Sequence, residues 1–232
     1  SLVGSDMCIR DRYNPLEKKH LGASVAEALL GRKPRALGKL TAFKGAGVYA
    51  LYYKGEFAPY RRIAELNRTD DPQAPIYVGK AIPAGGRKGV AITSSATTTT
   101  LYRRLKEHAE SIQSTENLLI DDFICRYLVV DDIWIPLGES LLIANFSPIW
   151  NTSLDGFGNH DPGSGRYKGL IPRWDVLHPG RAWAAKCAAR PETSKQIAAD
   201  VQARLDQEPS LARSRFLVEQ QRGTYRVIPK ID

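Results

Sequence analysis

The tripeptides Gly47-Val48-Tyr49 and Tyr77-Val78-Gly79 lie in two runs of strand-forming residues. These runs predict β-strands over Val48–Tyr53 and Ile76–Gly79, because aromatic and β-branched residues favour the pleated surface of a sheet. Pro75 directly precedes the second run, and a residue without an N–H group is tolerated at the start of a strand. Only a polar, proline-containing stretch separates the two runs, so we expect the strands to pair in one small sheet.

The rest of the chain reads as helices with one further strand. Apolar residues recur at a spacing of about 3.6 residues in several segments, which predicts amphipathic helices. The predicted helices are Asn14–Leu30, a turn around Arg61–Leu66, Leu101–Gln113, Pro136–Asn145 and Ser194–Leu205, with a third strand at Phe123–Val130 and a closing hairpin from Phe216–Val218 and Tyr225–Ile228. Residues 151–181 are expected to form an ordered loop. The fold class is α+β, a small mixed sheet flanked by helices, with an N-terminal helical lead-in, a long inserted loop and a C-terminal extension.

Composition indicates a globular chain with a basic surface. The 232 residues are 43% hydrophobic and 25% charged, enough to bury a sizeable core. The net charge of +8 and pI near 9.4 favour a polyanionic partner, although ribosome-associated and membrane-surface proteins share this balance. No apolar run could span a bilayer and no leader suggests secretion, so the cytoplasm is the expected compartment. Three cysteines without metal-ligand spacing predict a reducing compartment and no structural zinc.

Residues 81–100 form an unusual insertion. Glycines surround Arg87 and Lys88, and a tract of Ser and Thr broken only by Ala96 follows. A long loop without its own structure is uncommon in a compact domain unless it has a function. Two interpretations stay open. The insertion is either a solvated loop, or an arm whose backbone N–H groups, hydroxyls and cations contact phosphates.

Four polar residues follow in an order that suits the hydrolysis of a phosphodiester. Arg104 and His108 are four residues apart and project from one face of the predicted helix. Arg104 offers a planar fork matched to phosphate oxygens, and His108 titrates near neutrality. Glu139 could hold a hard divalent cation, and Asn151 a catalytic or phosphate group. Each residue also has a structural alternative. Arg104 would be a surface cation and His108 a structural imidazole. Glu139 would complement the helix dipole, and Asn151 would cap a turn.

Tyr49 and Tyr77 are harder to assign from chemistry. An unperturbed phenol has a pKa of roughly 10 and is a poor base at neutral pH, so a neighbouring cation or a metal-bound water must help. Lys80 and His108 are the candidates in this chain for lowering the cost of deprotonating a tyrosine. The alternative is that both tyrosines simply pack on the sheet.

Together, residues 43–151 resemble the GIY-YIG nuclease family. Gly47-Val48-Tyr49 is similar to its first motif, and Tyr77-Val78-Gly79-Lys80-Ala81 to its second, in the form also seen in bacterial excision-repair enzymes. Residues 101–108 are similar to its catalytic helix. The residues that match its metal-ligand helix and the exit from it are Gly138, Glu139, Leu142, Ile143, Pro148 and Asn151.

The resemblance implies a role for each candidate. Tyr49 would orient or deprotonate the attacking water, with His108 assisting. Tyr77 and Arg104 would hold the phosphate. Glu139 would hold one Mg2+ ion per active site, Asn151 would maintain the site geometry, and Lys80 would be a further catalytic residue.

Two runs in the extension, 156–163 and 174–181, resemble the type II restriction endonucleases of this family. This implies a sequence-specific double-strand DNA endonuclease that acts as a homodimer on a short, GC-rich palindrome, since a two-fold site presents both strands equivalently. The candidate DNA-binding residues are Arg87, Lys88, Asn159, His160, Arg166 and Arg173, whose cations suit guanine edges. A methyltransferase encoded nearby is a further expectation, and a membrane partner is not expected.

Two other functions stay open. They are a repair or mobile-element nickase and a non-catalytic DNA-binding module. The chain departs from the repair enzymes in one respect, because their arginine soon follows the second motif, whereas here the insertion 81–100 intervenes. Residues 1–12 resemble the translation of a sequencing adapter and are expected to be an assembly artefact. Residues 13–232 are expected to form one elaborated nuclease domain, with its core at about 43–151 and a DNA-reading or dimerising extension at about 152–232.

Overall fold

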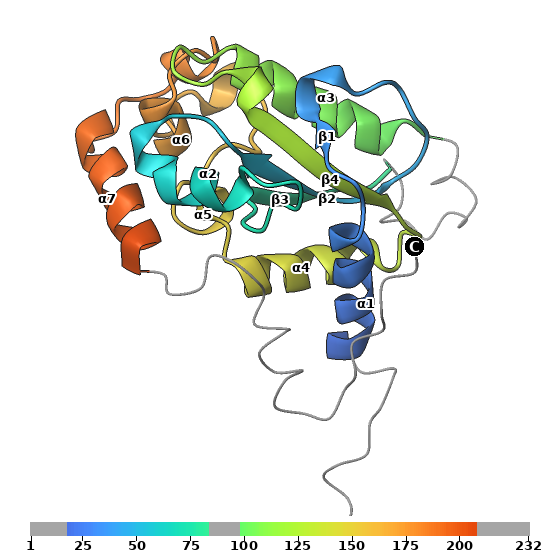
Figure 1. Cartoon of the computed structure of the whole chain (residues 1–232). Helices are drawn as coiled ribbons and strands as arrows, with labels where there is room; N and C mark the ends of the chain where they lie inside the picture. The colour runs from blue at the N-terminus through green and yellow to red at the C-terminus, as the bar shows by residue number, and fades with distance from the viewer. Residues whose placement is uncertain (1–17, 84–97, 208–232) are drawn as a thin grey trace, which may run out of the picture.

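The computed structural model describes residues 18–83 and 98–207, and Figure 1 shows a sheet between layers of helices. The strands are β1 (Arg35–Ala36), β2 (Gly47–Tyr53), β3 (Tyr77–Ala81) and β4 (Phe123–Val129), in the spatial order β1-β4-β2-β3. The α+β class with a small central sheet is confirmed. The sheet is antiparallel and not mixed as expected, because β4 runs opposite to both of its neighbours and β3 runs opposite to β2.

Residues 1–17, 84–97 and 208–232 lie outside the described structure. They include the segment expected to be an artefact, the expected start of the N-terminal helix, Arg87 and Lys88 of the insertion, and the segments expected to form a C-terminal hairpin. Among the residues that are described, no helix combines the length and the apolar character needed to cross a bilayer.

The strand β2 is buried on both faces. All seven of its residues are buried, which accounts for the unbroken run of apolar and aromatic residues in its sequence. Its odd-numbered residues from Tyr49 to Tyr53 belong to one hydrophobic cluster, and its even-numbered residues from Val48 to Tyr52 belong to a second. The sheet therefore separates two cores, and a side chain's position along the strand decides which core it enters.

Helices cover both faces of the sheet. The helices α1 (Lys18–Leu30) and α4 (Ile135–Phe146) pack on the even-numbered face, below the sheet in Figure 1. On the other face lie α2 (Arg61–Asn67), α3 (Thr100–Gln113), α5 (Ile149–Thr152), α6 (Arg173–Leu177) and α7 (Ser194–Gln207). Short 3-10 turns are η1 (Leu37–Lys39), η2 (Ala58–Tyr60), η4 (Ile120–Asp122), η5 (Ser164–Arg166) and η6 (Ala184–Lys186).

The predicted elements that fall wholly within the described residues are confirmed, with ends shifted by one or two residues. The expectation of a loop over 151–181 is wrong in part, because this region contains the end of α5 and all of α6. Both short helices deliver a tryptophan to the core. The rings of Trp150 and Trp174 meet edge to face with centroids 5.6 Å apart. Burial of these two rings explains helical turns that the polar sequence around them did not indicate.

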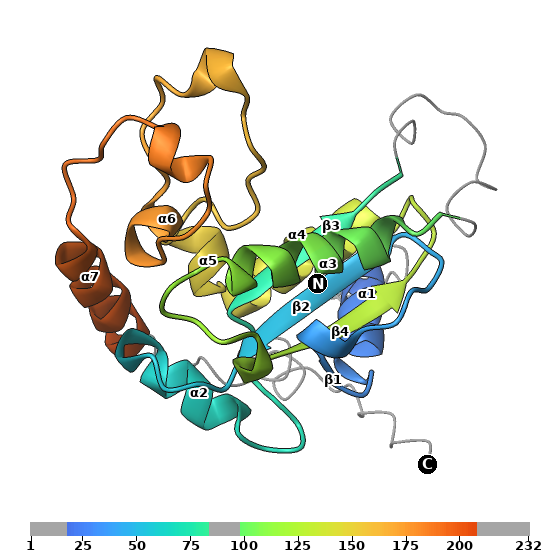
Figure 2. The same cartoon turned by 90° about the horizontal axis from the view of Figure 1, so that it is seen from above.

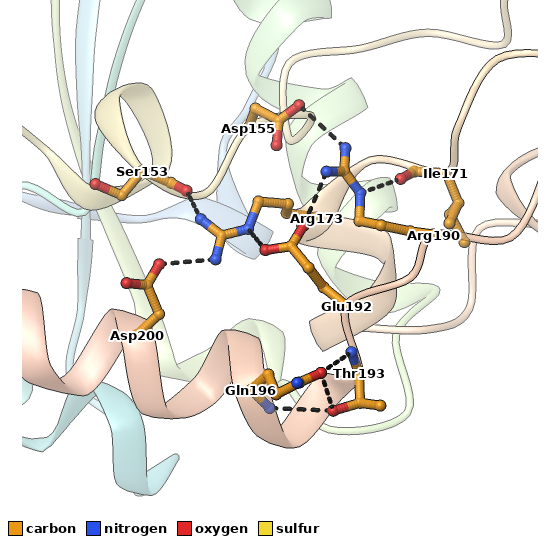
Figure 3. A network of polar contacts seen from close by, with 9 residues as sticks. All are labelled: Ser153, Asp155, Ile171, Arg173, Arg190, Glu192, Thr193, Gln196 and Asp200. Atoms are coloured by element: carbon orange, nitrogen blue, oxygen red, sulfur yellow. Dashed lines mark hydrogen bonds and ion pairs between the residues drawn. The ribbon is translucent and has the colours of Figure 1, made fainter.

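Arginines tie the C-terminal extension together (Figure 3). Arg173 donates to the carbonyl of Ser153 at 2.6 Å and pairs with Asp200 of α7 at 2.7 Å. Its Nε lies 3.2 Å from Glu192, which also pairs with Arg190 at 3.0 Å. These contacts join α5, α6 and α7 through charged side chains at the surface of the extension.

The helix α7 starts with a reciprocal cap, also visible in Figure 3. The backbone N–H of Thr193 donates to the side chain of Gln196 at 2.8 Å, and the N–H of Gln196 donates back to the Thr193 hydroxyl at 3.3 Å. This capping box satisfies donors that a helix start leaves unpaired. Figure 2 shows α7 beside α2, with the segment around η5 standing away from the sheet.

Candidate active site

The glycines of the two strand motifs each allow a close approach by a neighbouring strand. Tyr49 lies opposite Gly79 in the β2–β3 register, so both face the same side of the sheet. A Cβ at Gly79 would overlap the ring and hydroxyl of Tyr49. A Cβ at Gly47 would overlap the backbone of Leu128 on β4. The motif spacing therefore places a phenol across the neighbouring strand, where only glycine leaves space for it.

Tyr49 and His108 form a buried hydrogen-bonded pair. The Tyr49 hydroxyl lies 2.6 Å from Nε2 of His108, which comes from the buried face of α3. Burial, with Tyr77 adding to it, raises the pKa of Tyr49 well above its usual value. Burial, followed by the charges of Arg104 and others nearby, holds the pKa of His108 well below its usual value. At neutral pH both groups are therefore uncharged, and a single proton bridges the phenol oxygen and the ring nitrogen.

Arg104 lies one helical turn before His108 and points to the same centre. Its Nη2 donates to the carbonyl of Gly158 at 2.7 Å. Its Nη1 contacts Nε2 of His160 at 2.5 Å and Glu107 at 3.1 Å. The guanidinium also lowers the pKa of the nearby Tyr77, although burial is the larger effect and raises it. Arg104 is thus held by a loop of the extension and not left as a free surface cation.

Lys80 corrects one expectation from the sequence. It was a candidate for lowering the tyrosine pKa, yet it alternates with Tyr77 and Gly79 along β3 and faces the core of Val78 and α4. There its ammonium lies 2.6 Å from a carboxylate oxygen of Glu139. The pKa of Tyr49 is raised and not lowered, as described above. Lys80 therefore balances the charge of the proposed metal ligand.

Glu139 suits a single-carboxylate cation site. Among the described residues no group of three or more His, Cys, Asp or Glu side chains could hold a metal ion. Mg2+ does not need such a cage, because it keeps several waters and takes further oxygen from substrate phosphate. The Glu139 side chain is 18% exposed and already attracts the Lys80 ammonium. The residues present fit a hard cation bound through one carboxylate oxygen, with Lys80 as its competitor.

Asn151 braces the edge strand. Its Oδ1 accepts from the backbone N–H of Val78 and its Nδ2 donates to the Val78 carbonyl, both at 2.8 Å. The side chain does not cap α5, which was one alternative. Because β3 is at the edge of the sheet, these bonds fix Tyr77 and Lys80 on either side of Val78. The candidate residues thus surround β3, with Tyr49, Tyr77, Arg104 and His108 on one face. Glu139 comes from α4, and its charge adds to the effect of burial in raising the pKa of both tyrosines.

The DNA-binding candidates separate into two groups. Asn159, His160 and Arg166 line a cavity of about 520 Å3 beside Gly158, and His160 joins this cavity to Arg104. Arg173 lies elsewhere, with its guanidinium used by α5, α7 and Glu192 as described above. Its side chain is 17% exposed, which places it in the scaffold of the extension. Arg87 and Lys88 lie outside the described residues.

Sequence reasoning missed the contribution of Phe157. Its ring stacks on His108 with centroids 4.5 Å apart and planes 17° apart, and it meets Tyr77 edge to face at 4.9 Å. With the Gly158 carbonyl on Arg104, this makes the loop after α5 one wall of the site. The aromatic residue between two glycines at 156–158 was the available signal, but it indicated only a packed or DNA-reading loop.

Comparison with known families matches residues 41–205 to the Eco29kI GIY-YIG domain. The match covers more than half of the chain and includes all the catalytic candidates together with most of the extension. No curated protein matches the chain. The match agrees with the sequence motifs and with the antiparallel sheet whose strands carry them. The chain therefore belongs to the GIY-YIG family of type II restriction endonucleases, in its Eco29kI group.

Proposed function

We propose that this restriction-type nuclease is a Mg2+-dependent enzyme that cuts both DNA strands at a specific, short palindrome. The observation that carries the proposal is the buried hydrogen bond between the Tyr49 hydroxyl and Nε2 of His108. A phenol bonded to a neutral imidazole can accept a proton from water while it gives its own proton to the ring. With Arg104 beside the pair, this chemistry suits phosphodiester hydrolysis.

The proton moves from water to the imidazole through the tyrosine. The Tyr49 oxygen takes a proton from the attacking water as its own hydrogen passes to His108, so the phenol stays neutral and the ring becomes a cation. Burial and the nearby Arg104, His160 and Arg181 side chains oppose this step in the free protein. A bound phosphate brings negative charge to Arg104, which offsets the positive charge of its guanidinium. The pKa of His108 is therefore expected to rise when DNA binds.

The phosphate requires a change of partner at Arg104. Its Nη2 is bonded to a backbone carbonyl, whereas its Nη1 contacts the exposed side chain of His160 and that of Glu107. A phosphate oxygen would take the Nη1 side, because an exposed side chain moves aside more easily than backbone. The Tyr77 hydroxyl is a second donor on the same face. Arginine suits this position because its fork holds one partner with each arm.

Glu139 would hold the metal beside the edge strand β3, close enough to Tyr49 and Tyr77 for its charge to add to the effect of burial in raising their pKa. When bound there, Mg2+ supplies neutralisation of charge on the departing oxygen. Lys80 shares the Glu139 carboxylate and would keep its position fixed before the cation arrives. Asn151 holds Val78 of this strand, which supports its proposed role in site geometry.

Specificity and symmetry are the remaining parts of the proposal. The net charge of +8 favours the DNA backbone. Asn159, His160 and Arg166 line the cavity next to Arg104 and are the described candidates for reading bases. Arginine donors suit guanine O6 and N7, in keeping with a GC-rich site. One catalytic centre per chain favours a homodimer on a palindrome. The enzyme would act in the cytoplasm, and a methyltransferase encoded nearby would protect host DNA.

Plasmid cleavage tests the proposal directly. The purified protein is incubated with supercoiled plasmid and Mg2+, and the ends are mapped. Discrete double-strand fragments with ends at one palindrome are expected, and removal of Mg2+ with a chelator should stop cleavage. Nicked circles or a smear would replace the proposal with the nickase function. Binding without cutting would replace it with the non-catalytic module.

A further inference from the structure

A buried ion pair lies behind the loop that walls the active site. Arg181 Nε donates to Oδ1 of Asp175 at 2.6 Å, and Nη2 donates to Oδ2 at 2.5 Å. The two side chains are only 5% and 1% exposed. Removing two charges from water is costly, and apolar residues of the same volume often serve stability equally well. A pair kept at this depth calls for a reason other than stability.

The remaining donors of Arg181 hold the loop backbone. Nη1 donates to the carbonyls of Phe157 and Asn159, each at 3.1 Å, and Nη2 donates to the carbonyl of Gly156 at 2.9 Å. With the two bonds to Asp175, these five bonds use all five N–H donors of the guanidinium. The rings of Trp174 and Trp183 lie on the cation at 4.6 and 4.7 Å. Arg181 is therefore fixed in position, and it fixes the loop 156–159 in turn.

The same loop contacts two catalytic candidates. Phe157 stacks on the His108 ring, and the Gly158 carbonyl accepts from Arg104. Arg181 bonds to the carbonyl of Phe157 itself and to those of Gly156 and Asn159, which flank the two contact residues. A displacement of the loop would therefore remove the stacking partner of the imidazole and one anchor of the guanidinium together.

We propose that Arg181 and Asp175 are positioning residues, which set the orientation of Arg104 and His108 by holding the loop 156–159 against α3. This inference rests on the proposed nuclease function and deepens it. It assigns to the extension a task in catalysis, in addition to DNA reading. Arg181 reaches neither substrate nor metal in this arrangement and acts through the loop.

The charge of Arg181 gives this role a measurable signature. The groups that face His108 are Tyr49 of β2, Tyr77 of β3, Arg104 of α3, and His160 and Arg181 of the extension. Burial is the first cause of the low His108 pKa, and the nearby Arg104, His160 and Arg181 side chains add to it. Removing the charge of Arg181 and loosening Phe157 should both raise the pKa of His108.

The test uses the double variant Arg181→Met with Asp175→Leu, which leaves no unpaired buried charge. The His108 ring is titrated by NMR in the free protein, without DNA or metal, and single-turnover cleavage is measured across pH. We expect a folded variant with a raised His108 pKa, a pH–rate profile shifted in the same direction, and a kcat lower by about 10²-fold with KM little changed. Arg181→Lys keeps the positive charge but lacks the guanidinium fork. Its His108 pKa should be close to that of the unmodified protein, while its cleavage rate should remain lower.

Arg126→Met is the matched control, because Arg126 is also a buried arginine bonded to backbone carbonyls and an aspartate. It lies on β4 away from the loop 156–159, so its loss should lower stability and leave the His108 titration unchanged. A folded double variant with unchanged titration and unchanged kcat overturns the inference. If the double variant does not fold, Arg181→Lys decides, since an unaltered rate in that variant also overturns it. If the unmodified protein cuts no DNA, the proposed function fails, and the titration alone still tests the positioning role.

Discussion

Tyr49→Phe is the most informative substitution, because the chain offers a matched control. Tyr60 also bonds through its hydroxyl to a buried histidine, His178 Nε2, at 2.6 Å, the same distance as in the Tyr49–His108 pair. Both tyrosines are fully buried on the same side of the sheet. Only Tyr49 faces Arg104 and Tyr77, so the two pairs share their burial and hydrogen bonding and differ in the chemistry proposed for them.

The expected cost in stability follows from the groups left without a partner. Tyr49→Phe leaves the buried Nε2 of His108 unpaired, which should lower the free energy of unfolding by about 1–3 kcal/mol. Tyr60→Phe leaves both Nε2 of His178 and Nε1 of Trp150 unpaired, because the Tyr60 hydroxyl bonds to His178 Nε2 and accepts from Trp150 at 2.9 Å. Its cost should be about twice as large.

Cleavage should follow the opposite order. A positioned base contributes about 10²- to 10⁴-fold to a rate, or roughly 3–5 kcal/mol in the barrier. Tyr49→Phe removes the atom that would accept the proton from water, so it should lose most of this contribution to the rate. Tyr60→Phe should cut DNA at close to the unmodified rate wherever it is folded, although it is the less stable protein.

Urea unfolding gives the free energies, and single-turnover cleavage with Mg2+ is measured well below both unfolding midpoints. Tyr49→Phe protein that still cuts within tenfold of the unmodified rate would refute the base assignment. Equal loss of cleavage in both variants would show that destabilisation, and not chemistry, explains the effect.

Three further predictions concern the metal ligand, the strand motif and the buried histidines. Glu139→Ala should abolish detectable cleavage, a loss of about 10³-fold or more, while gel-shift binding of DNA is largely kept; retained cutting would remove Glu139 from the metal role. Gly79→Ala should lose cleavage and about 1–3 kcal/mol of stability, because the added Cβ overlaps the Tyr49 phenol, and an unchanged unfolding midpoint would contradict that contact. His108 and His178 are buried and neutral, with the pKa of His178 lowered by burial to about 3. The unfolded imidazoles take up protons below about pH 6.5 while the folded ones do not, so stability should fall as pH drops through that value, by about 1.4 kcal/mol per pH unit for each group. Urea unfolding between pH 7.5 and 5.5 checks this slope, and a flat profile would exclude burial in the neutral form.

The sheet and the longer helices could be predicted because their sequences carry periodic signals. The buried strand β2 is a continuous run of apolar and aromatic residues, and α3 shows a buried stripe that includes His108. The four-residue spacing of Arg104 and His108 correctly indicated a shared direction, which the contacts to Tyr49 and Gly158 display. Local periodicity was sufficient for these elements because each is stabilised by burial of one or two continuous faces.

The walls of the site could not be predicted in the same way. Phe157 stacks on His108 from a loop whose backbone is held by Arg181, far along the chain. Neither the glycine-rich loop nor the segment around Arg181 has a period that indicates its partner. Lys80 is a different case, since the two-residue alternation of β3 already placed it on the face opposite Tyr77. Its pairing with Glu139 could therefore have been inferred, had α4 been placed on that face.

The bonds that Asn151 makes to β3 also limit how this protein can associate with itself. An unpaired strand edge invites the edge strand of a second molecule. Here the N–H and carbonyl of Val78 are taken by the Asn151 amide, and the carbonyl of Ile76 accepts from the backbone of Trp150 at 3.1 Å. A second chain cannot extend the sheet along this stretch without displacing them. Strand pairing between two copies is therefore blocked along this part of β3, and β1, at the other edge of the sheet, is the strand that the Asn151 amide leaves unaffected.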